Sequence, residues 1–180
     1  MQSVINRAGV RTGTYAGLVS AIVLACAGVV GLVLHQPWLF PSLGPTLMVM
    51  TETPRQPAAR PRNVIVGHAV GVAAGYLALV VTGLTGAPPV IRTGVNWQFV
   101  LAAALALGLT SFVLQAIDMP HPPAGATTLI VGLGLLNKPG ELGVILLAVV
   151  LVTAGASAVN RLRGVRNQGE PVEQGPRQRP

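Results

Sequence analysis

Four long apolar stretches constrain the fold of this chain more than any other feature. They cover residues 14–34, 64–84, 97–117 and 142–159. A helix of about 20 residues crosses a hydrocarbon core about 30 Å thick, and the first three stretches reach that length without a formal charge. Charged residues make up only 9% of the chain, against about 25% in soluble domains. The sequence therefore predicts an all-α, polytopic transmembrane protein.

Two shorter apolar segments, residues 38–50 and 124–136, have prolines at their start and are too short to span a membrane as helix. A shift of 81 residues superposes one on the other and also brings the long stretches into register. The aligned pairs are Pro41 with Pro122, Gly44 with Gly125, and Thr46 with Thr127. We therefore expect one transmembrane domain over residues 1–160. It would hold two repeats, about 14–84 and 97–160, each made of helix, short broken helix and helix.

The distribution of basic residues bears on whether the short segments cross the membrane or turn back. If both cross, ten lysine and arginine residues lie on one side and two on the other, whereas the four-span alternative divides them eight to four. The positive-inside bias favours crossing, with both termini cytoplasmic. Because a unit of three crossings reverses direction, the two repeats are then inverted. We expect residues 161–180 to form a disordered basic cytoplasmic tail, and we place the protein in the cell (inner) membrane.

The prolines at residues 120–123 interrupt the third apolar stretch. Proline ends a helix but is favoured at the first position of a new one. We expect a short helix to start at Pro123, with free N–H groups and the positive end of its dipole facing the break. Such a helix start binds anions. Pro41–Thr46 would build a similar start from the other side. The alternatives are a plain loop at the prolines and threonine hydroxyls bonded to their own helix.

The residues 119–126, MPHPPAGA, resemble the signature of the HPP family of integral membrane proteins, which is named for its His-Pro-Pro tripeptide. Residues 41–44 and 59–68 resemble the family's other recurrent pattern, and the similarity runs from about residue 14 to 160. The family is usually described with four spanning helices. Some plant and cyanobacterial members are implicated in nitrite transport, so the resemblance implies a membrane transporter.

The histidines and glycines each carry two interpretations. His121 either donates to an anion or carries a proton, or else caps the preceding helix. His68 either lines the cytoplasmic mouth with Asn63 or is a packing residue. Gly67, Gly71 and Gly75 lie on one helix face, which indicates close packing against another helix or a smooth pore wall. Since this glycine face needs a partner, we expect a homo-oligomer.

The combined prediction is a transporter or channel for a small inorganic anion, possibly nitrite. The alternative is a membrane sensor or scaffold that binds the anion without transport. No nucleophile and base pair and no metal-ligand spacing stand out, so we expect no enzyme activity, metal or cofactor. The basic residues sit at helix ends, so the expected partners are membrane lipid and the anion rather than nucleic acid. The expected anion-binding residues are Gly44, Pro45, Thr46, Asn63, His68, His121, Pro122, Pro123, Gly125, Ala126, Thr127 and Thr128.

Overall fold

The computed structural model describes residues 7–165, and this part of the chain is helical throughout, without strands. Four helices are long and apolar enough to cross a membrane. They are α1 (Arg7–Leu34), α3 (Pro61–Val81), α5 (Trp97–Ala116) and α7 (Pro139–Leu162). Each of the four predicted apolar stretches is therefore a single helix, and the all-α fold class is confirmed.

Prolines and glycines divide the rest of the described chain into short elements. These are α2 (Leu43–Glu52), the 3₁₀ turn η1 (Pro57–Ala59), α4 (Val90–Thr93) and α6 (Ala124–Gly132). The first short segment is not helical from residue 38, because Pro37 and Pro41 keep residues 37–40 out of helix and a turn at residues 41–42 precedes α2. The second ends four residues earlier than its apolar run, where Gly134 turns the chain at a φ of 75°. Helix α4 was not predicted from the sequence.

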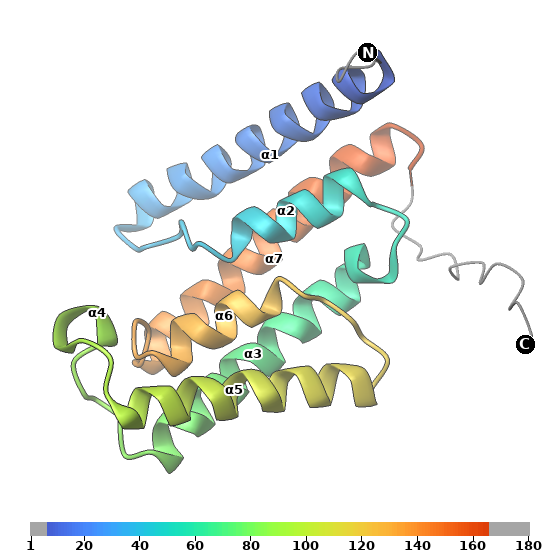
Figure 1. Ribbon diagram of the computed structural model, residues 1–180. Coiled ribbons are helices and arrows are strands. Elements are labelled where there is room, and N and C mark those ends of the chain that lie inside the picture. The colour runs from blue at the N-terminus through green and yellow to red at the C-terminus, as the bar shows by residue number, and fades with distance from the viewer. Residues whose placement is uncertain (1–6, 166–180) are drawn as a thin grey trace, which may run out of the picture.

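The segments that contain α2 and α6 each run from one end of the molecule to the other. Residues 38 and 39 pack beside Gly31 and Gly28 near the end of α1. The end of α2, in contrast, lies near the start of α1, where both helices line one pocket. Figure 1 shows α2 and α6 starting in the middle of the molecule and running toward opposite ends. Both segments therefore run the length of the molecule alongside the long helices.

The second segment returns along α5 in the same manner. A Cβ added to Gly125 would contact Leu107, one added to Gly132 would contact Ala106, and one added to Gly134 would approach Phe99. We call the end of the molecule with Arg11, Arg55 and Arg163 the arginine end, and the opposite end the α4 end.

The glycine face of α3 packs against α6 of the same chain. A Cβ at Gly71 would lie 2.8 Å from Thr128 Oγ1, and one at Gly75 would lie 2.7 Å from Val131 Cβ. The packing interpretation of these glycines is therefore confirmed. Because α6 already covers this face, the glycines no longer give a reason to expect a homo-oligomer.

The packing of the six main helices follows a regular pattern. Helix α6 contacts α3 and α5, and α2 contacts α7 and α1 in the corresponding way, while α3 and α7 pack against each other. The buried apolar side chains form one cluster that these six helices share. At the C-terminal side, α7 continues to Leu162, past the predicted start of the tail, and residues 166–180 lie outside the described residues.

Candidate functional site

His68 joins the first turns of the two short helices. Its Nε2 lies 2.9 Å from Thr46 Oγ1 on α2, and its Nδ1 lies 2.7 Å from Thr127 Oγ1 on α6. All three residues are fully buried. We call His68, Thr46, Thr127 and His121 the histidine junction, since the Nε2 atom of His121 lies 3.3 Å from that of His68. The structure thus brings together four of the residues that the sequence analysis expected at the site.

The hydrogen bonds of the histidine junction determine where its protons lie. His121 Nδ1 is 2.8 Å from the carbonyl of Ala58, so it must carry the hydrogen and donate. In a neutral His121 ring the Nε2 atom then accepts. Because the Thr46 hydroxyl donates to Ser42 O, His68 Nε2 carries the hydrogen and shares it between Thr46 Oγ1 at 2.9 Å and His121 Nε2 at 3.3 Å. His68 Nδ1 consequently accepts from the Thr127 hydroxyl. The network is satisfied with both rings neutral.

The threonine hydroxyls were expected either to bind an anion or to bond to carbonyls of their own helix. The hydroxyls of Thr46 and Thr128 donate to Ser42 O and Ala124 O four residues earlier, so for these two the back-bonding interpretation is confirmed. The Thr127 hydroxyl instead donates across to His68. Thr128 also receives a hydrogen bond from Thr110 on α5, which the sequence analysis did not single out. For His121 the capping alternative is wrong, because its acceptor is Ala58 rather than a carbonyl of α5.

The expectation of free N–H groups at the start of α6 is wrong. The amides of Ala124, Gly125 and Ala126 donate to the carbonyls of residues 121, 122 and 123, at 3.0, 3.0 and 3.1 Å. The helix begins at Ala124 with Pro123 in helical geometry before it, so the two prolines form a tight first turn that satisfies these amides. At the start of α2, Pro45 has no N–H to offer. The dipole of α6 still favours an anion at the helix start, but the amides of its first turn already have hydrogen-bond partners.

A cavity of about 320 Å³ borders the proline break on the α5 side. Its polar lining includes Thr110, Ser111 and Gln115 from α5 and the backbone around Gly125. His121 and Pro122 form part of the same wall. Gly125 is half-buried, and a Cβ there would meet Leu107 at 3.3 Å. This cavity is therefore the space that adjoins the predicted anion-binding residues.

One buried hydroxyl beside the histidine junction has no partner within the described residues. The Ser42 hydroxyl is completely buried at the N-cap of α2 and makes no hydrogen bond there. A buried polar group left unsatisfied costs about 1–3 kcal/mol, so this hydroxyl does not stabilise the fold through a hydrogen bond. Ser42 lies within the motif at residues 41–44 but is not among the anion-binding residues expected from the sequence.

Other candidates lie away from the junction or are held by the backbone. The Asn63 amide donates to Pro57 O and is buried, so it secures the turn before α3 rather than facing an open mouth. Asp118 and His35 are exposed and have positive φ values of 51° and 53°. Within residues 7–165, no three histidine, cysteine, aspartate or glutamate side chains gather where they could hold a metal ion.

Comparison with known proteins decides the family. The model of the HPP transmembrane region matches residues 5–168. This chain belongs to the HPP transmembrane family. The His-Pro-Pro tripeptide of this HPP protein therefore lies at the break before α6, with its histidine in the junction. Together with the four long apolar helices, membership establishes a membrane protein.

Two transmembrane proteins of Dictyostelium discoideum are similar to this HPP chain. One is 32% identical over 100 residues, which is 56% of this chain and 32% of the relative. The other is 31% identical over 93 residues, which is 52% of this chain and 27% of the relative. The matches thus span about a third of the length of these relatives. No solved structure matches the chain.

Proposed function

We propose that this HPP protein is a transporter or channel for a small inorganic anion, with nitrite as the candidate that the family resemblance suggests. The observation that carries the proposal is the histidine junction, where two short helices start side by side in the interior. Irregular backbone at membrane depth is stable only when it is buried in protein or lines a cavity. Here it does both, since the break before α6 is buried at His121 and borders a cavity at Gly125.

The helix geometry supports an anion rather than a cation. The starts of α2 and α6 both lie at the junction, and a helix start carries a partial positive charge. The buried Ser42 hydroxyl adds a donor that no described residue uses. An anion in the cavity beside Gly125 would meet the side chains of Ser111 and Gln115 on α5 and the His121 ring at the proline break. Protonation of the histidine pair would add a positive charge at the same place, so we propose that flux depends on pH.

We further propose that the two repeats are inverted, with α1, α2 and α3 equivalent to α5, α6 and α7. The packing supports this, because exchanging the two sets leaves the pattern of helix contacts unchanged. Inverted repeats whose discontinuous helices meet at the centre are typical of transporters. Both termini would then be cytoplasmic in the cell inner membrane. A homo-oligomer stays a prediction, and no surface is assigned to it. The proposal includes no enzymatic activity.

The test is nitrite flux into proteoliposomes that contain the full chain. We expect time-dependent uptake above that of protein-free vesicles, and we expect Gly125→Leu to abolish it by filling the cavity. Gly17→Leu is the matched control, since a Cβ at Gly17 meets nothing within 4 Å. Absence of flux for nitrite, nitrate, chloride and formate would overturn the proposal.

One observation favours the alternative of a membrane sensor or scaffold. Both ring nitrogens of His68 already have partners, so the junction is closed in this structure. A sensor would bind the anion with saturation and show no flux in the same vesicles. Radiolabelled or fluorescence-detected binding to the purified chain separates the two functions.

A further inference from the structure

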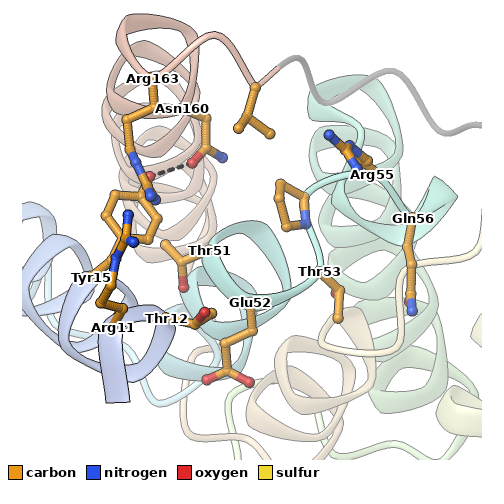
Figure 2. A pocket seen from close by; sticks show the side chains of 12 residues that line it. Arg11, Thr12, Tyr15, Thr51, Glu52, Thr53, Arg55, Gln56, Asn160 and Arg163 are labelled. Atoms are coloured by element: carbon orange, nitrogen blue, oxygen red, sulfur yellow. Dashed lines mark hydrogen bonds between the residues drawn. The ribbon is translucent and has the colours of Figure 1, made fainter. Parts of the chain in front are cut away.

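A second polar cavity lies at the arginine end of the molecule and shares no lining residue with the cavity at the proline break. It has a volume of about 620 Å³ and is bounded by the start of α1, the end of α2 and the end of α7. Pockets for small ligands span about 300–1,000 Å³. The side chains of Arg11, Arg55 and Arg163 all contribute to its walls. Figure 2 shows Arg11 and Arg163 at the Tyr15 ring on one wall and Arg55 across the pocket.

Hydrogen bonds and stacking hold one of these arginines in place. The Arg163 guanidinium lies 3.6 Å from the centre of the Tyr15 ring, at a distance typical of a cation–π contact. The Tyr15 hydroxyl donates to Asn160 Oδ1, and the Asn160 amide donates to Met50 O at the end of α2. Asn160 is buried, so this chain of contacts ties α1, α2 and α7 together beneath the pocket. The Arg163 guanidinium is therefore held against the Tyr15 ring.

The charges of the pocket are unbalanced. Its lining includes one carboxylate, that of Glu52, against three guanidinium groups. Within residues 7–165 the structure records no ion pair between Glu52 and these arginines, and the Glu52 carboxylate lies apart from them in Figure 2. A monovalent anion would balance only part of this charge. Arginine forks match the oxygens of phosphate in two-point hydrogen bonds.

We propose that this pocket binds a phosphate group, carried either by an anionic lipid headgroup or by a soluble phosphorylated compound. Arg163 and Arg11 hold the group from one wall and Arg55 from the other. The hydroxyls of Thr51 and Thr53 already donate to carbonyls of α2, so the guanidinium groups rather than these hydroxyls supply the hydrogen bonds to the phosphate. The proposal is independent of anion transport at the histidine junction.

The experiment follows thermal unfolding of the full chain in neutral detergent by circular dichroism. A ligand that binds the folded state raises the unfolding temperature. Phosphatidic acid, phosphatidylcholine of the same chain length, and inorganic phosphate are titrated separately. Stabilisation by phosphatidic acid alone supports the lipid source, and stabilisation by inorganic phosphate as well supports a soluble ligand.

Variants distinguish a built pocket from a generally basic surface. We expect Arg163→Gln and Arg55→Gln each to raise, at least about tenfold, the concentration of the phosphate probe that gives half of the maximal stabilisation. Loss of a hydrogen bond to a charged group predicts this change. Tyr15→Leu should weaken binding too, although it leaves the charge unchanged. Arg92→Gln, at the α4 end, is the matched control and should bind as the wild type does. The proposal is overturned if neither phosphate probe stabilises the chain, or if Arg92→Gln weakens binding as much as Arg163→Gln.

Discussion

The Nε2 atoms of His68 and His121 lie 3.3 Å apart where α2, α3 and α6 meet. Their rings are 5.1 Å apart between centroids and tilted by 57°, so the contact runs edge to edge through nitrogen rather than by stacking. One ring is fixed by Ala58 and the other by two threonines. The hydrogen on His68 Nε2 therefore lies between the two facing nitrogens. Histidine is the side chain whose charge changes near neutral pH.

The first prediction concerns His121→Asn. An asparagine amide lies about where Nδ1 lies in histidine, so it can still donate to Ala58 O while the nitrogen facing His68 is lost. If the pair carries a proton during transport, nitrite flux in this variant should depend much less on pH than in the wild type. His35→Asn, at an exposed position, should keep the wild-type profile. An unchanged profile for His121→Asn would make the ring structural.

The second prediction separates function from stability at Ser42. Because its hydroxyl is buried without a partner, Ser42→Ala should leave the unfolding temperature unchanged or raise it. Flux should nevertheless fall about tenfold if the hydroxyl donates to the passing anion, since a hydrogen bond to a charged group contributes about 1.5–3 kcal/mol. Ser157→Ala removes another buried, unpartnered hydroxyl on α7 and is the control. Equal flux in the two variants would remove Ser42 from the site.

The third prediction tests the contact between α3 and α6. A Cβ at Gly75 would lie 2.7 Å from Val131 Cβ and 2.8 Å from Thr128 O. Gly75→Ala should therefore destabilise the fold by about 1–3 kcal/mol, as overpacking does. Gly17→Ala meets no neighbour and should instead stabilise the helix by about 0.5–1 kcal/mol. Thermal unfolding of both variants in the same detergent measures the difference. A stabilised Gly75→Ala would show that α6 does not pack on this face.

The fourth prediction concerns orientation in the membrane. In a Cys26→Ala background, a cysteine replacing Gln56 at the arginine end should resist an impermeant thiol reagent added outside intact cells. A cysteine replacing the exposed Val95 at the α4 end should react. The physical reason is the positive-inside bias, which places the arginine end in the cytoplasm. Labelling of the cysteine at position 56 from outside would reverse the assigned orientation.

The elements of this fold were predictable from local sequence because each depends on local chemistry. Apolar length predicted the four long helices, and the prolines near residues 41 and 122 predicted where the short helices interrupt them. The predicted start of the first short helix was wrong, since apolar residues 38 and 40 are buried in irregular chain rather than in helix. Apolarity reports burial and says little about backbone shape in a short segment.

The partners of the polar residues were not predictable in the same way. Thr127 is 59 residues from His68, and Asn160 is 145 residues from Tyr15. No spacing rule connects such pairs. The free amides expected at α6 are used by carbonyls of the proline turn, because a tight 3₁₀ start forms its own hydrogen bonds. Which atom accepts a given hydrogen bond depends on how the helices pack, and residue types alone do not give that packing.

The sequence on its own determined that this chain is a helical membrane protein, because too few charges are available to cover a surface in water. It also determined that two proline breaks interrupt the apolar pattern. Only the tertiary structure decided that His68 lies between the two short helices and that three arginines share one cavity. These contacts join residues far apart in the chain, so they arise only once the helices pack.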